Sequence, residues 1–212
     1  MAYEREKEIA LAAVREAAML CRAVRADMVS DDSLEKADRS PVTVADFGSQ
    51  ALICRRLQEA FSEDPVVGEE DAAELRKPTN ASMLEHVSRY TARFREGVQS
   101  QDLCDWIDLG NGKVGKRFWT LDPIDGTKGF LRNDQYAVAL ALIEDGEVKV
   151  GALACPVLPV HADAPEGDVG LLFIAVRGQG TRVIPMDGGE EDSVRVVSEE
   201  TQENWRFVES VE

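Results

Sequence analysis

Hydrophobic residues recur at three- and four-residue spacing along residues 4–29, which predicts one long helix that serves as scaffold. No glycine or proline interrupts this repeat, and its apolar members are Ala10, Val14, Ala17, Cys21, Val24 and Met28. A second helix is predicted from Thr43 to Phe61, after a break at Ser40-Pro41. Its core side is expected to carry Phe47, Ala51, Cys54, Leu57 and Phe61.

Shorter elements are predicted between residues 66 and 109. Val66-Val67-Gly68 is a strand candidate, and residues 82–96 have the spacing of a further helix. Ser82 and Glu85 have capping-box spacing at its start. The apolar stripe of this helix comprises Leu84, Val87, Thr91 and Phe94. Asp102 to Leu109 is predicted to add another turn of helix.

From residue 118 onward the pattern becomes that of a β-meander. The apolar run Phe118–Leu121 predicts a buried strand that ends at Asp122-Pro123, because proline cannot continue a central ladder. Asp145-Gly146 is a hairpin signal between two further strands. These two strands are predicted at 135–144 and 147–155, and three more at 170–177, 181–185 and 194–198. This order predicts an α+β fold with helices packed on a largely antiparallel sheet.

Composition places the chain among ordinary globular proteins and narrows its partners. Of its 212 residues, 44% are hydrophobic and 30% charged, and the net charge of −16 argues against nucleic-acid or anionic-membrane binding. No apolar run approaches the roughly 18 residues needed to cross a membrane, and the acidic N-terminus shows no secretory or transit peptide. The four cysteines are widely spaced, which favours reduced thiols and a cytoplasmic location.

Carboxylates occur where several predicted elements begin or end. Asp46 is expected in the first turn of the second helix, Glu69 follows one strand, and Asp122 and Asp125 follow another. Convergence of such groups would build a site for two divalent ions, which can polarise a phosphoryl group and lower the pKa of a bound water. Gly126-Thr127 follows directly, where backbone amides could approach a phosphate or open a helix. Bound cations would also reverse the repulsion between this acidic chain and a phosphate ester.

Each acidic group also has a purely structural interpretation. Asp46 could complete a capping box with Thr43, and Glu69 could lie in a solvated acidic loop with its neighbours. Asp122 and Asp125 could cap their own backbone within a turn. The loop 110–116 matches most of a P-loop, but Arg117 stands where a magnesium-binding hydroxyl is required and a strand follows instead of a helix.

Three segments together resemble the lithium-sensitive, magnesium-dependent phosphatase family that includes inositol monophosphatase and 3'(2'),5'-bisphosphate nucleotidase. The segments are residues 40–46 (SPVTVAD), 67–71 (VGEED) and 121–127 (LDPIDGT). The continuation Lys128-Gly129-Phe130-Leu131-Arg132 is similar to the bisphosphate nucleotidase branch, whereas inositol monophosphatases usually continue with Thr-Asn-Phe.

The resemblance implies a role for each of these residues. Glu69, Asp122, Asp125 and the backbone carbonyl of Ile124 would ligate Mg²⁺. Asp46 and Thr127 would orient and deprotonate the attacking water. The amides of Gly126 and Thr127 would hold the phosphate.

The implied reaction is hydrolysis of adenosine 3',5'-bisphosphate (PAP) to AMP and phosphate, with the sulfated nucleotide PAPS and inositol 1,4-bisphosphate as further substrates. The alternatives are an inositol phosphate phosphatase and a non-catalytic module that binds metal or a partner. The resemblance also implies a sugar-phosphatase-like N-terminal half in residues 1–204. Residues 205–212 would begin the α/β half, and no Trp-Asp motif follows in this sequence. The resemblance therefore implies the N-terminal portion of such an enzyme, without the aspartate that completes the metal site, and truncation could make this chain inactive.

Overall fold

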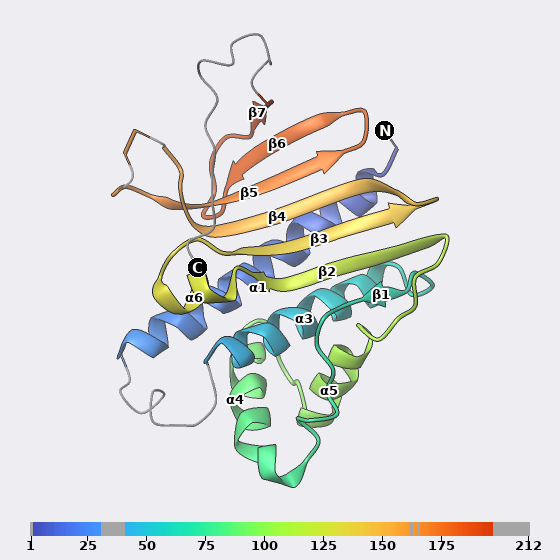
Figure 1. Cartoon of the computed structure of the whole chain (residues 1–212), viewed down its shortest axis with the longest axis vertical. Helices are drawn as coiled ribbons and strands as arrows, with labels where there is room; N and C mark the ends of the chain where they lie inside the picture. The colour runs from blue at the N-terminus through green and yellow to red at the C-terminus, as the bar shows by residue number, and fades with distance from the viewer. Residues whose placement is uncertain (1, 31–40, 162, 165, 197–212) are drawn as a thin grey trace.

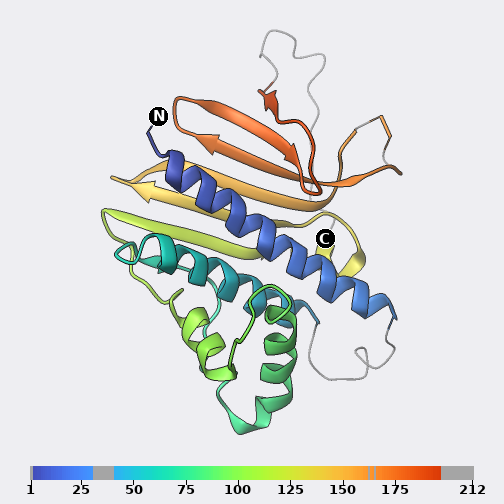
Figure 2. The ribbon, with the colours of Figure 1, turned by 180° about the vertical axis from the view of Figure 1, so that it is seen from behind.

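Two long helices, α1 (Glu4–Ser30) and α3 (Pro41–Ala60), cover one face of a β-sheet in the computed structural model (Figures 1 and 2). The structure describes residues 2–30, 41–161, 163–164 and 166–196. Within these ranges the sheet has seven strands, in the order β1-β2-β3-β4-β5-β6-β7. No helix in the described ranges is both long and apolar enough to cross a membrane. The predicted second domain, residues 205–212, lies outside them.

The sheet is antiparallel except at one edge. Its strands are β1 (Val66–Val67), β2 (Arg117–Asp125), β3 (Ala137–Glu144), β4 (Glu147–Pro159), β5 (Val169–Val176), β6 (Gly180–Pro185) and β7 (Asp192–Val194). Only β1 pairs in parallel among these strands, with Val67 opposite Thr120 of β2. The α+β prediction is therefore confirmed. The last predicted strand is displaced: Val194 ends β7, and residues 197–198 lie outside the described part of the chain.

Helix α1 follows its predicted pattern closely. Five of the six predicted core positions, Ala10 to Val24, are fully buried, and the side chain of Met28 lies outside the description. The helix packs diagonally across β3, β4 and β5 and alongside α3. These contacts make it part of the scaffold of the sheet.

Helix α3 begins earlier than its sequence pattern predicts. Pro41 opens it, a position where the missing N–H of proline costs nothing. Thr43 is therefore inside the helix and not its cap. Asp46 lies in the second turn, so both the first-turn placement and the capping-box interpretation were wrong.

Two shorter helices, α4 (Ala81–Thr91) and α5 (Ser100–Asp108), pack against α3 beyond the β1 edge (Figure 1). The predicted capping box of α4 is wrong, because Asn80 stands at the cap and makes no side-chain hydrogen bond there. The 3₁₀ turn Pro78–Asn80 leads directly into α4 and fixes its start instead. The helix also ends five residues before residue 96, at Thr91.

Strand β2 does not end at Asp122. It continues through Pro123 to Asp125, where pairing with β3 resumes at Ala137 after a register shift between Asp122 and Asp125. A bulge of this kind leaves the proline nitrogen outside the ladder, so the strand tolerates it. The bulge turns the site segment away from regular pairing while both of its ends stay attached to the sheet.

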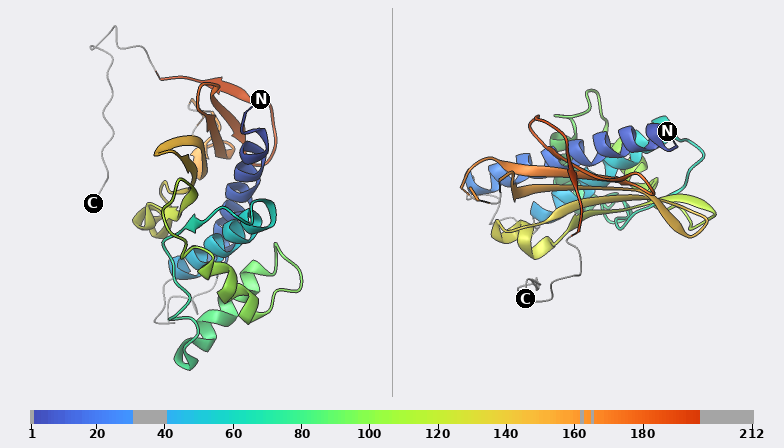
Figure 3. Two further views of the ribbon diagram at one scale, coloured as in Figure 1. Left: turned by 90° about the vertical axis from the view of Figure 1, so that its right-hand side faces the viewer. Right: turned by 90° about the horizontal axis from the view of Figure 1, so that it is seen from above.

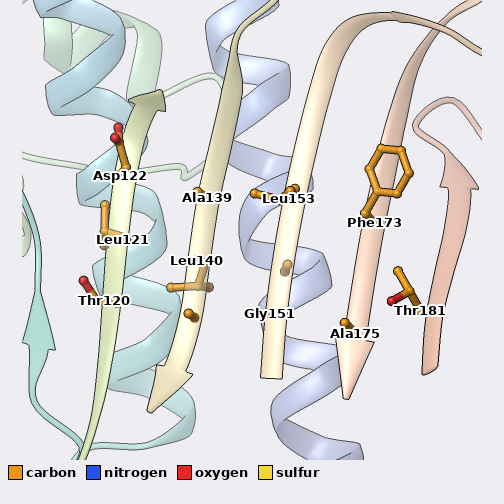
Figure 4. Close-up of a pocket in the computed structure, with 12 residues that line it drawn as sticks. Thr120, Leu121, Asp122, Ala139, Leu140, Gly151, Leu153, Phe173, Ala175 and Thr181 are labelled. Carbon is orange, nitrogen blue, oxygen red and sulfur yellow. The ribbon is translucent and has the colours of Figure 1, made fainter. Parts of the chain in front are cut away.

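The second face of the sheet has no covering layer among the described residues (Figure 3). Small and apolar side chains form a shallow hollow there (Figure 4). Ala139, Leu153 and Phe173 lie side by side across β3, β4 and β5, and Gly151 and Ala175 are paired two residues away along β4 and β5. Asp122 lies at the β2 side of this hollow. The candidate site is therefore continuous with an open, largely apolar surface, which we call the open sheet face.

Candidate active site

The parallel pairing of β1 with β2 places two acidic side chains at the same edge of the sheet. The register sets Val67 opposite Thr120, and Glu69 and Asp122 each follow their paired residue by two positions. Because parallel strands end on the same side, both carboxylates reach the same region. Glu69 is exposed and Asp122 half-buried, so the sequence prediction that these two carboxylates converge is consistent with the pairing.

Asp46 adds a third carboxylate from α3, which packs against β2. Burial first, and then the charges of three neighbouring carboxylates, raise the pKa of Asp46 to about 8. The three neighbours are Glu70, Glu69 and Asp122. At neutral pH a carboxyl group with this pKa mostly keeps its proton, and a bound cation would lower the pKa so that the carboxylate could accept a proton from water.

The bulge segment of β2 shapes the other wall of the site. The Ile124 amide donates to Oδ1 of Asp122 at 3.1 Å, which is the local capping that the structural interpretation of this turn predicts. Burial, and then the negative charges of Glu69 and Asp125, raise the pKa of Asp122. Asp122 therefore both caps its turn and belongs to the acidic cluster.

The chain reverses after Asp125 through Gly126, whose φ of +92° lies in the left-handed region. Helix α6 (Thr127–Arg132) then begins. The Thr127 hydroxyl donates to the Ile124 carbonyl at 3.4 Å, so in this conformation it is bonded within its own turn. Thr127, Gly126 and Asp125 are all exposed.

The acidic side chains lie near one another but are not arranged as a complete set of metal ligands among the described residues. Over the described ranges, no three histidine, cysteine, aspartate or glutamate side chains are arranged to hold a metal ion. The cluster nevertheless fits a hard divalent cation, because its side chains offer oxygen donors and the charges that act on Asp46 from the described residues are negative. A cation would relieve the repulsion that raises the pKa values of Asp46, Glu70 and Asp122.

The three consecutive acidic residues 69–71 have different surroundings. Glu70 is half-buried and contributes charge to the cluster, a part that the sequence did not assign to it. Asp71 instead accepts the Ala73 amide at 2.6 Å and the side-chain amide of Asn111 at 3.2 Å. Asp71 is thus a loop-capping residue, as the solvated-loop interpretation predicts.

The loop that resembles a P-loop belongs to the edge of the sheet. The Gly112 amide donates to the Val66 carbonyl at 2.8 Å, and Asn111 forms an antiparallel bridge with Val67. The loop leads into β2 and not into a helix, so it lacks the strand–loop–helix context of a phosphate-binding P-loop.

Sequence reasoning missed one buried polar residue beside the site. Gln50 is fully buried in α3, one turn after Asp46, and it bonds to the backbone of Glu69 and Glu70. A glutamine adjoining the predicted core positions Ala51 and Cys54 was the available signal, because a buried amide requires partners.

Comparison with known proteins agrees with this arrangement. A profile of the Inositol monophosphatase family matches residues 3–208. The 3'(2'),5'-bisphosphate nucleotidase 1 of Arabidopsis thaliana is 41% identical over 232 aligned positions, covering 100% of this chain and 66% of that protein. The 3'(2'),5'-bisphosphate nucleotidase of Schizosaccharomyces pombe is 38% identical, covering 100% of this chain and 65% of its own length. The chain thus spans slightly less than two thirds of these relatives.

Solved structures share the fold. Mycobacterium tuberculosis SuhB superposes with a TM-score of 0.53 at 22% identity, over 92% of this chain and 52% of that one. The inositol monophosphatase from Anabaena gives a TM-score of 0.50 at 17% identity, over 86% and 48%. The family match covers nearly all of the sequence and includes every element of the acidic site. This chain belongs to the inositol monophosphatase family.

Proposed function

We propose that this chain carries the metal site of a Mg²⁺-dependent phosphomonoesterase that hydrolyses adenosine 3',5'-bisphosphate to AMP and phosphate. The observation that carries the proposal is the cluster of carboxylates at the ends of β1 and β2, joined by Asp46 from α3. The substrate follows from the names of the relatives, which are bisphosphate nucleotidases. PAPS and inositol 1,4-bisphosphate are further candidates of the same chemistry.

Glu69, Asp122, Asp125 and the Ile124 carbonyl are the groups we propose to hold Mg²⁺. The ion would supply charge neutralisation for the phosphoryl group and a bound water of lowered pKa. The first three residues are side-chain donors at adjoining strand ends, and the Ile124 carbonyl already accepts a hydrogen bond within the same turn. Their oxygen atoms match the preference of a hard cation.

Asp46 is the residue we propose to receive a proton from the attacking water. The water oxygen would bond to phosphorus, the bond between phosphorus and the ester oxygen would break, and the ester oxygen would take a proton from solvent water. Thr127 would help to orient that water once its hydroxyl turns from the Ile124 carbonyl. The exposed amides of Gly126 and Thr127, at the start of α6, are proposed phosphate contacts.

Residues 1–204 are proposed to form the metal-site domain, with further substrate contacts coming from a second domain that begins at 205–212. The proposed compartment is the cytoplasm, supported by the four free thiols at Cys21, Cys54, Cys104 and Cys155.

Phosphate release from adenosine 3',5'-bisphosphate in the presence of Mg²⁺, with and without Li⁺, tests the function. Asp122→Asn is the control, because the amide oxygen keeps its bond to Ile124 while the charge is lost. Release by the parent chain should exceed that of the control and fall with Li⁺. Equal release from the two chains would contradict the enzymatic proposal and favour a non-catalytic binding module.

An inositol phosphate is the second candidate substrate, because the matching profile carries the name of the inositol monophosphatases. Competition between inositol 1,4-bisphosphate and adenosine 3',5'-bisphosphate at one Mg²⁺ concentration ranks the two. The residues Lys128-Gly129-Phe130 lead us to expect preference for the nucleotide.

A further inference from the structure

Gln50 lies between the elements that carry the acidic cluster. Its side chain is 0% exposed, and it follows Asp46 by one turn of α3. A primary amide has two donor hydrogens and two acceptor lone pairs, and a buried amide is costly unless these are used. The identity of its partners therefore shows what this residue does.

All four hydrogen bonds of the Gln50 amide go to backbone groups. Oε1 accepts from the amides of Glu69 and Glu70, at 3.1 and 2.9 Å. Nε2 donates to the carbonyls of Glu70 and Ile107, at 2.7 and 3.0 Å. The Gln50 side chain thus provides hydrogen-bond partners for the backbone of Glu69 and Glu70, which follow the last residue of β1 paired with β2.

Two glycines, Gly68 and Gly110, lie directly beside the side-chain amide of Gln50. A Cβ atom at Gly68 would come within 2.5 Å of Oε1, and one at Gly110 within 2.4 Å of Nε2. The Gly68 amide also donates to the Gly110 carbonyl at 2.8 Å. The two backbone segments can reach Gln50 only because neither position has a side chain.

We propose that Gln50 is a positioning residue that fixes Glu69 relative to Asp46 and so sets the geometry of the cation site. Asp46 and Gln50 share one rigid helix, and Gln50 holds the backbone amide of Glu69 itself. The exposed Glu69 side chain is thereby attached to the same helix as the proposed base. This inference deepens the proposed function and rests on it for the identity of the cation.

Gln50→Met tests the proposal, since methionine has similar length and leaves the four backbone groups without their partner. Leu172→Ala is the matched control, because it lowers stability through a cavity in β5, remote from β1 in the strand order. Mg²⁺ binding is measured by calorimetry on full chains, together with the Tm of each metal-free protein.

We expect Gln50→Met to weaken Mg²⁺ binding about tenfold or more, the usual effect of removing a group that orients a ligand. Leu172→Ala should lose a comparable amount in Tm and keep the dissociation constant within about twofold of the parent value. Parental Mg²⁺ affinity in Gln50→Met would overturn the proposal.

Amide hydrogen exchange of Glu69 and Glu70 supplies a second readout that needs no metal. Both amides should be protected in the parent and in Leu172→Ala, and should exchange at least about a hundredfold faster in Gln50→Met. If the parent fails to bind Mg²⁺, the proposed function fails while this measurement still decides the role of Gln50. Unchanged exchange at both amides would overturn the positioning role.

Discussion

Asp122 shows how one side chain can both cap its own turn and belong to a cluster of carboxylates. Its Oδ1 accepts the Ile124 amide, which stabilises the bulge, and its charge adds to the repulsion within the acidic cluster. Asparagine retains the acceptor and removes the charge. The two roles can therefore be separated by a single substitution.

We predict that Asp122→Asn keeps the fold and loses most of its stabilisation by Mg²⁺. In the parent, Mg²⁺ at a hundred times its dissociation constant should add about 2.7 kcal/mol to the free energy of unfolding. Calorimetric Tm values with and without Mg²⁺ measure the difference. Asp192→Asn, an exposed change in β7, should respond like the parent. An Asp122→Asn protein that gains as much from Mg²⁺ as the parent would refute the ligand assignment.

Gly129, next to the site in α6, is predicted to be intolerant of any side chain. A Cβ atom there would lie 1.9 Å from the Gln135 carbonyl oxygen, so backbone must move. We expect Gly129→Ala to cost about 2–3 kcal/mol of unfolding free energy in urea denaturation. A loss below about 1 kcal/mol, or the gain of up to about 1 kcal/mol that Gly→Ala gives at an unhindered position, would contradict the steric explanation.

At the scale of elements, the β3–β4 hairpin follows directly from its turn residues. Asp145 and Gly146 have φ values of 54° and 76°, both left-handed, as a type I′ turn requires. Asp145-Gly146 is a strong signal for this turn because aspartate tolerates that region and glycine is unrestricted in it.

Gly146→Ala is predicted to cost about 1 kcal/mol of unfolding free energy. No atom lies within 4 Å of the added Cβ, so the cost comes from the backbone conformation alone. Urea denaturation of Gly146→Ala beside Gly129→Ala separates the two causes. Equal losses in the two variants would contradict the distinction between conformational cost and steric overlap.

The long periodic helices and the hairpin were predictable because local chemistry determines them. The end of β2 was not, because Pro123 is tolerated through a bulge that depends on pairing with β3. The start of α3 was placed two residues late for a related reason: Pro41 resembles a breaker although it is a favoured first residue.

The candidate site was predictable where it depends on local sequence and was not predictable where it depends on long-range contacts. Glu69, Asp122 and Asp125 could be named from their positions after predicted strands, and the β1–β2 register is consistent with the convergence of Glu69 and Asp122. Asp46 was named from a predicted first turn, although it lies in the second turn of α3. The role of Gln50 could not be predicted, because it depends on which backbone segments meet that side chain in three dimensions.

For the whole molecule, the open sheet face has a measurable consequence. Leu153 stands in its hollow with 41% of its surface exposed, beside the half-buried Phe173. We predict that the chain binds an environment-sensitive apolar dye, and that Leu153→Lys lowers the fluorescence at least about twofold by placing a charge in the hollow. Val114→Lys, which removes an exposed apolar side chain from the loop 110–116, is the control. Equal fluorescence from the two variants would show that the dye binds elsewhere.

Helix α1 packs on β3, β4 and β5, which lie far along the chain from Glu4–Ser30. On the ribosome, α1 emerges before these strands exist, and β4 ends only at Pro159. At usual elongation rates the interval is on the order of ten seconds. Helix α3 arrives sooner and can shield one side of α1. The rest of the apolar stripe of α1 stays uncovered until the strands of the meander have been synthesised, so the nascent chain exposes apolar surface during that interval.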